Sequence, residues 1–97
     1  NRVWKRASGQ HRVGQLLAEY YLRQGDVDRA IKILKKAARQ RPTIAVKLSL
    51  ARAYLKQGTA KSISIALKLV HGLGNKHPLN STIRKTLGRA YLQANKP

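Results

Sequence analysis

A short phrase occurs three times along the 97-residue chain, at Leu17–Leu22, Leu50–Leu55 and Leu87–Leu92. Each copy starts with leucine and a small residue and ends with tyrosine and leucine, and the repeated tyrosines are 33 and 37 residues apart. Self-similarity at a period of about 20 to 50 residues is typical of stacked repeats, in which each unit buries its apolar face only against its neighbours. The repetition therefore predicts a stacked-repeat fold that functions through its surface.

Hydrophobic spacing predicts a pair of helices in the first unit. Apolar residues recur at helical intervals over 11–24, and a second apolar stripe with small residues runs from Ala30 to Ala38. Gly25 can end the first helix in the left-handed conformation, and Asp26 can cap the second. Pro42 prevents the second helix from extending. This unit is therefore expected to be a helix-turn-helix.

The same pattern continues toward the C-terminus. It predicts helices over 44–57 and 60–73, with the glycine-containing segment 71–76 as a helix-ending turn rather than a phosphate-binding loop. Asn80 or Ser81 can cap a fifth helix. That helix is expected to face the following residues inward: Ile83, Leu87, Ala90, Tyr91 and Leu92. The repeated tyrosines are interpreted as core residues.

The order of leucine, small residue, tyrosine, glycine, alanine and proline over about 34 residues resembles the tetratricopeptide repeat. In the first unit the resemblance runs through Leu17, Ala18, Tyr21, Gly25, Asp26, Ala30, Leu34, Ala37 and Pro42. It extends over 11–97, although the second unit has an insertion of about three residues and departs from the pattern after Gly58. The resemblance implies an all-α fold of antiparallel helix-turn-helix units, stacked as a right-handed superhelical solenoid of about 2.5 repeats.

We expect the whole chain to form one domain, divided into repeat units. Residues 1–10 are expected to be a tail or the end of a preceding repeat helix, 11–42 the first unit, and 43–78 the second unit with its insertion. Residues 79–97 would supply the first helix of a third unit. We interpret the chain as an excerpt of a longer solenoid.

Charge limits the possible functions. The chain has 21 lysines and arginines against three acids, a net charge of +18, which favours an anionic partner. It has no cysteine, and its three histidines lack the spacing of a helical metal pair. The carboxylates of Asp26 and Asp28 are explained by helix capping, which leaves no acid pair for catalysis. We therefore expect no enzyme activity, metal, cofactor, small-molecule substrate or membrane insertion.

The resemblance implies that the first helix of each pair lines a concave groove that binds a partner. The groove residues are expected to be Arg12, Gln15, Glu19, Arg23, Leu48, Arg52, Lys56, Lys85, Arg89 and Gln93. Leu22 and Leu55 would add apolar contact. Glu19 can alternatively hold Arg23 or Arg52. The groove is then either an anion-binding site or a solvated face of a basic chain.

A second basic surface is predicted on the outer helix. This stripe consists of Arg29, Lys32, Lys35, Lys36 and Arg39, which share one side of the helix at spacings of three and four. It can follow a phosphate backbone, or it can be a solvated face on which Asp28 pairs with Lys32.

One known family activity is disfavoured. Repeats of this family that hold acidic chaperone tails use a clamp of lysine, asparagine and arginine side chains. The matching positions here are Gln15, Glu19, Ser49, Thr82 and Thr86, and none of them has the clamp's residue type. Glu19 would repel the ligand's carboxylate.

Three functions remain open. The first is a protein-interaction scaffold whose basic groove binds an acidic segment, a helix or a larger assembly. The second is binding of RNA or another anionic polymer through the stripe. The third is a structural part of a solenoid whose other repeats compensate the charge.

Overall fold

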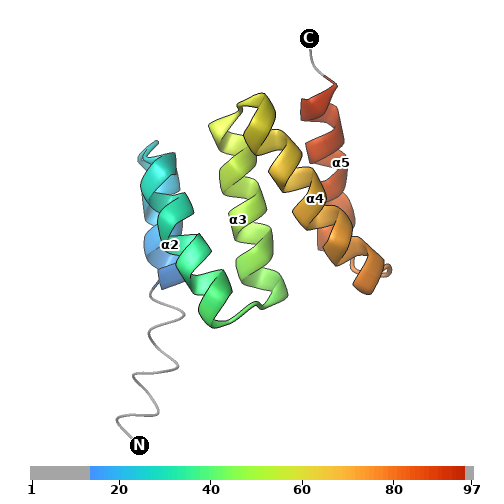
Figure 1. Cartoon of the computed structure of the whole chain (residues 1–97), viewed down its shortest axis with the longest axis horizontal. Helices are drawn as coiled ribbons and strands as arrows, with labels where there is room; N and C mark the ends of the chain where they lie inside the picture. Colours follow the sequence, from blue (N-terminus) through green and yellow to red (C-terminus); the bar gives the residue numbers. More distant parts are fainter. Residues whose placement is uncertain (1–13, 96–97) are drawn as a thin grey trace, which may run out of the picture.

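The computed structural model describes residues 14–95, and in this range the chain forms five helices and no strand. A first helix covers 14–23 and is followed by α2 (Val27–Gln40), α3 (Ile44–Gln57), α4 (Ala60–Lys76) and α5 (Ser81–Ala94). In Figure 1 the first helix and α2 overlap at one end, α3 lies in the middle, and α4 and α5 overlap at the other end. The predicted all-α helical-repeat fold is confirmed.

Local residue choices end and start the helices as the sequence predicts. Gly25 and Gly58 both have the positive φ, 85° and 76°, that favours glycine at a helix C-terminus. Asp26 caps α2 by accepting a hydrogen bond from the Arg29 N–H at 3.3 Å. Of the two predicted caps for α5, Asn80 is the residue that accepts the first-turn N–H, from Ile83 at 3.1 Å.

The predicted end of α4 is wrong. The helix continues through Gly72 and Gly74 to Lys76, so the segment 71–76 is helical rather than a turn. Leu73 is 5% exposed and its carbonyl accepts the His77 N–H at 2.9 Å. Packing of the helix against α3 and α5 outweighs the low helix propensity of the two glycines.

The core is a layer of small and aliphatic side chains between the helices. Leu34, Val70 and Ile83 are its largest fully buried side chains, and alanines such as Ala51 let neighbouring helices approach closely. The central helix α3 contacts α2, α4 and α5, which explains why most of its residues are buried.

Burial differs from the prediction at the C-terminal end. Tyr54 is 6% exposed and Tyr21 is half-buried, but Tyr91 is 45% and Leu92 is 71% exposed. The inward placement predicted for Tyr91 and Leu92 is therefore wrong. The positions repeat, but in the described part of the chain no helix follows α5 to cover it.

Candidate functional site

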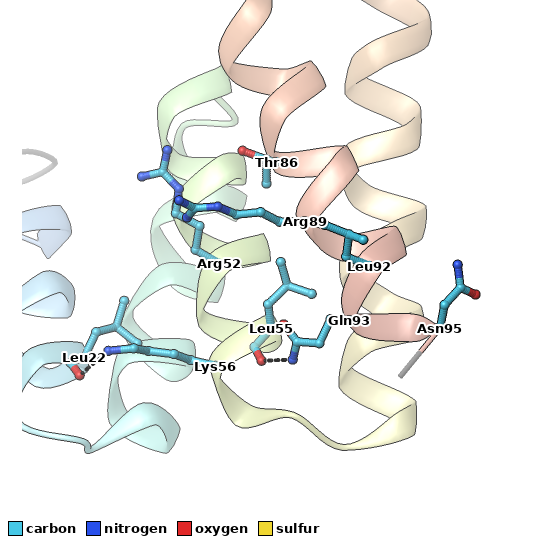
Figure 2. A pocket seen from close by; sticks show the side chains of 9 residues that line it. All are labelled: Leu22, Arg52, Leu55, Lys56, Thr86, Arg89, Leu92, Gln93 and Asn95. Carbon is cyan, nitrogen blue, oxygen red and sulfur yellow. Dashed lines mark hydrogen bonds between the residues drawn. The ribbon is translucent and has the colours of Figure 1, made fainter. Parts of the chain in front are cut away.

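The principal cavity lies across the first helices of the repeats. It has a volume of about 750 Å³ and spans from the end of helix 14–23, over α3, to α5. We call it the groove. It is lined by Leu22, Arg52, Leu55, Lys56, Thr86, Arg89, Leu92, Gln93 and Asn95 (Figure 2).

Among the described residues 14–95, three cationic side chains and no acid line the groove. In Figure 2, Arg89 extends from α5 toward α3, where Arg52 lies. The same two arginines line an adjoining cavity of about 460 Å³ together with Lys85. Like charges placed together repel each other, and an anion bound between them relieves that repulsion.

Two hydrogen bonds join the first helices to one another. Lys56 Nζ donates to the Leu22 carbonyl at 3.2 Å, and Gln93 Nε2 donates to the Leu55 carbonyl (Figure 2). Both bonds use the same repeat positions, because each acceptor follows a repeat tyrosine by one residue and each donor follows the next tyrosine by two. Both acceptors are carbonyls in the last turn of a helix, and the Leu22 carbonyl also accepts the Gly25 N–H of the following turn at 3.2 Å. These bonds hold the groove's walls in register.

The groove also has an apolar part. Leu55 is 8% exposed, Leu22 is half-buried and Leu92 is 71% exposed. An apolar side chain that entered the groove would cover Leu92 and gain the free energy of burying that surface.

Several predicted groove residues come together and others do not. Arg52, Lys56, Arg89 and Gln93 line the groove, and Lys85 lines the adjoining cavity. Leu48, in contrast, is 5% exposed and belongs to the core cluster. It is buried because α3 packs against helices on several sides.

The remaining predicted positions are on or before helix 14–23. Gln15, Glu19 and Arg23 lie on that helix but line neither cavity, and Arg12 lies outside the described residues.

Three groove residues were not predicted, namely Thr86, Leu92 and Asn95. A signal for Leu92 was present, since it repeats the positions of Leu22 and Leu55. Thr86 is 4% exposed, and its hydroxyl is satisfied by donating to the Thr82 carbonyl at 2.9 Å.

The acids of the described residues pair elsewhere than predicted. Within 14–95, Asp26 forms the one ion pair found, with Arg29 at 3.3 Å. Asp28 accepts a hydrogen bond from Gln57 Nε2 at 3.1 Å instead of pairing with Lys32. Glu19 forms no ion pair with Arg23 or Arg52. No described acid therefore neutralises the arginines of the groove.

The stripe on α2 is exposed over its whole length. Arg29, however, is held by Asp26 and lies over the Tyr21 ring, 5.6 Å from its centroid. Lys36 and Arg39 are exposed to solvent, while Lys32 and Lys35 line a separate cavity between α2 and α4. The stripe is therefore a discontinuous basic surface.

Residues 14–95 contain no cluster of histidine, cysteine, aspartate or glutamate that could hold a metal ion. His71 and His77 are exposed, and His11 is outside this range. No helix in the described part is long and apolar enough to cross a membrane.

Comparison with known proteins identifies the fold. The family model of the tetratricopeptide repeat matches residues 12–53, which hold the first helix pair and most of α3. Neither the search of curated proteins nor the search of solved structures returned a significant match. Beyond residue 53 the helix-turn-helix arrangement continues with α4 and α5. The match over residues 12–53 and the helix-turn-helix architecture together support assignment of the chain to a tetratricopeptide repeat family.

Proposed function

We propose that this chain is a non-enzymatic protein-interaction scaffold whose groove binds an acidic segment of a partner protein. Tetratricopeptide repeats generally mediate protein–protein interaction and are typically non-enzymatic modules. The observation that carries the proposal is the groove's lining, in which Arg52, Lys56 and Arg89 surround apolar side chains and no acid is present.

The lining defines the chemistry of the partner. A carboxylate between Arg52 and Arg89 accepts charge-assisted hydrogen bonds from both guanidinium groups, which are the stronger kind. Lys56 already donates to a backbone carbonyl, so the two arginines supply most of the recognition. A bulky apolar residue next to the acid would cover Leu92. The partner is thus an acidic segment with an apolar anchor.

Calorimetric titration tests this proposal. An acidic peptide with one central leucine is titrated into the unmodified chain and into the double variant Arg52→Glu/Arg89→Glu. The matched control is Lys68→Glu/Lys76→Glu, which makes the same charge change at two exposed positions of α4 outside the groove. Loss of one partner of a charge pair weakens binding by about 2 to 5 kcal/mol, so we expect at least about a thirtyfold loss in the groove variant.

The control decides between the groove and general charge attraction. We expect the affinity of the control variant to stay within about threefold of the unmodified chain, because its changes act only through screened, long-range charge. Equal losses in both variants would show that the peptide responds to net charge alone, and the groove proposal would then be wrong.

Binding of RNA or another polyanion through the stripe is the alternative function. Labelled single-stranded RNA is titrated at several salt concentrations against the chain and against a variant with Lys32, Lys36 and Arg39 changed to Gln. Each neutralised phosphate contributes about 0.7 to the slope of log affinity against log salt for a single strand. A slope that flattens by about 2 in the variant, together with weak peptide binding, would favour the polyanion function over the groove.

A further inference from the structure

A second cavity lies on the other side of α3, between the two outer helices. It has a volume of about 530 Å³ and collects side chains from α2, from the end of α3 and from the start of α4. Its lining consists of Asp28, Ile31, Lys32, Lys35, Tyr54, Gln57, Thr59, Lys61, Ser62 and Ile65. It shares no residue with the groove.

The buried tyrosine of this cavity has an unused hydroxyl group. Tyr54 is 6% exposed, and its hydroxyl forms no hydrogen bond with any residue of the described range. Within that range no buried side-chain oxygen or nitrogen lacks a partner. Because the Tyr54 hydroxyl has no partner in that range, it is not one of the fully buried atoms. Since Tyr54 lines the cavity, this hydroxyl is available to donate to a ligand there.

Positively charged residues line the same cavity from two helices. Lys32 and Lys35 reach the cavity from α2, and Lys61 reaches it from the first turn of α4. The capping box of Thr59 and Ser62 satisfies part of the α4 N-terminus. The positive end of the 17-residue α4 dipole adds to the lysine charges.

One acid also lines the cavity. Asp28 accepts a hydrogen bond from Gln57 at 3.1 Å, which directs part of its carboxylate toward another lining residue. Three lysines against one aspartate leave a net positive charge at the cavity. Its apolar walls are Ile31, which is 7% exposed, and Ile65, which is 37% exposed.

We propose that this cavity is a binding site for a phosphate monoester. Three lysines, a tyrosine and the N-terminus of α4 line the cavity from three helices, and their donors suit the three terminal oxygens of a phosphate. The walls formed by Ile31 and Ile65 receive the carbon group that the phosphate esterifies. The ligand is either a free phosphorylated small molecule or a phosphorylated side chain of a partner protein.

Phenyl phosphate is the first probe, titrated into the whole chain at constant ionic strength and followed by amide chemical shifts in NMR. Phenyl sulfate, a monoanion of the same shape, serves as the ligand control. We expect the largest shifts at Tyr54, Lys61 and Ser62. A phosphotyrosine peptide and its unphosphorylated form then distinguish the two sources of the phosphate, since flanking residues add affinity only if the site receives a partner's side chain.

Variants separate this site from the general positive charge of the chain. Tyr54→Phe removes only the free hydroxyl, and we expect about a tenfold loss of phenyl phosphate affinity, as for a hydrogen bond to a charged group. Lys35→Gln/Lys61→Gln removes two cations of the cavity. Its matched control, Lys68→Gln/Lys76→Gln, removes two exposed cations of α4 that do not line the cavity.

The outcomes are distinct. A loss of at least about tenfold in Lys35→Gln/Lys61→Gln, with less than about twofold in the control, supports the site. Equal losses in the two double variants, an unchanged affinity in Tyr54→Phe, or shifts spread evenly over exposed lysines would overturn it. Circular dichroism checks that each variant is folded. The acidic-peptide affinity of the groove should be unaffected by Tyr54→Phe, so this proposal and the groove proposal fail separately.

Discussion

Replacing Ile83 with alanine tests how α5, and with it one wall of the groove, is held in place. Ile83 is fully buried, while the other buried residues of α5 are the smaller Thr86 and Ala90. It packs closely on α4, since a Cβ added at Gly74 would lie 3.8 Å from its Cγ2 atom. The docking of α5 therefore depends strongly on this one side chain.

The expected magnitude follows from the atoms removed. Ile83→Ala deletes three carbon groups, each worth about 0.8 kcal/mol of apolar burial, and leaves a cavity that adds a further penalty. Together these lower the stability of the docked helix by about 3 kcal/mol. A tenfold change corresponds to about 1.4 kcal/mol, so the equilibrium for local opening of α5 rises by about 100-fold. In a stacked repeat the other helices remain folded, because each unit contacts only its neighbours.

Hydrogen exchange measured by mass spectrometry resolves this local opening. We expect amides of α5 to exchange about 100-fold faster in Ile83→Ala, while those of α2 and α3 keep their protection. Acidic-peptide affinity should fall as well, since Thr86, Arg89, Leu92, Gln93 and Asn95 line the groove from α5 and its C-terminal cap.

The control is Leu34→Ala, which removes an equally buried side chain from α2. It should lower the protection of α2 more than that of α5. The reasoning is refuted if Ile83→Ala lowers the protection of all helices equally, or if the exchange of α5 rises by less than about tenfold.

Three further predictions concern stability, measured by thermal and urea unfolding. Gly58→Ala should destabilise the chain by about 1 kcal/mol because the φ of Gly58 is 76°. Gly88→Ala should stabilise it by about 0.5 to 1 kcal/mol, because Gly88 is an exposed helical position with open space at the Cβ. A change of stability in the same direction for both variants would contradict this. Asp26→Ala should lower stability by about 1 kcal/mol, because it removes the N-cap of α2. Asp26→Asn should lower it clearly less, because asparagine keeps the cap and loses only the exposed ion pair with Arg29. Equal losses in the two variants would show that the ion pair has the larger effect. Raising NaCl from about 50 to 500 mM should raise the unfolding temperature, since salt screens the repulsion of a net charge of +18, and a constant or falling temperature would contradict this.

Much of the fold was predictable because it depends on local properties of the chain. A glycine four residues after a repeat tyrosine ends a helix wherever it occurs, and an aspartate or asparagine side chain accepts first-turn N–H groups through contacts within three residues. The bounds of α3 agree with the predicted range for the same reason. The repetition of these signals predicted both the helix pairs and the family.

The partners of individual side chains were decided by tertiary structure. Lys56 and Gln93 donate to carbonyls 34 and 38 residues away, and no local pattern reveals such an acceptor. Asp28 likewise pairs with Gln57, 29 residues away, rather than with the nearby Lys32. Such long-range contacts depend on how one repeat stacks on the next.

Burial shows the same division between local sequence and tertiary structure. Tyr54 and Tyr91 occupy the same place in the repeated phrase, yet Tyr54 is 6% and Tyr91 is 45% exposed. The sequence by itself determined which residues form helices and which face of each helix is apolar, because these follow from interactions within a few residues. Only the tertiary structure decided which apolar faces are covered and which basic side chains lie together, because both depend on which helices pack against each other.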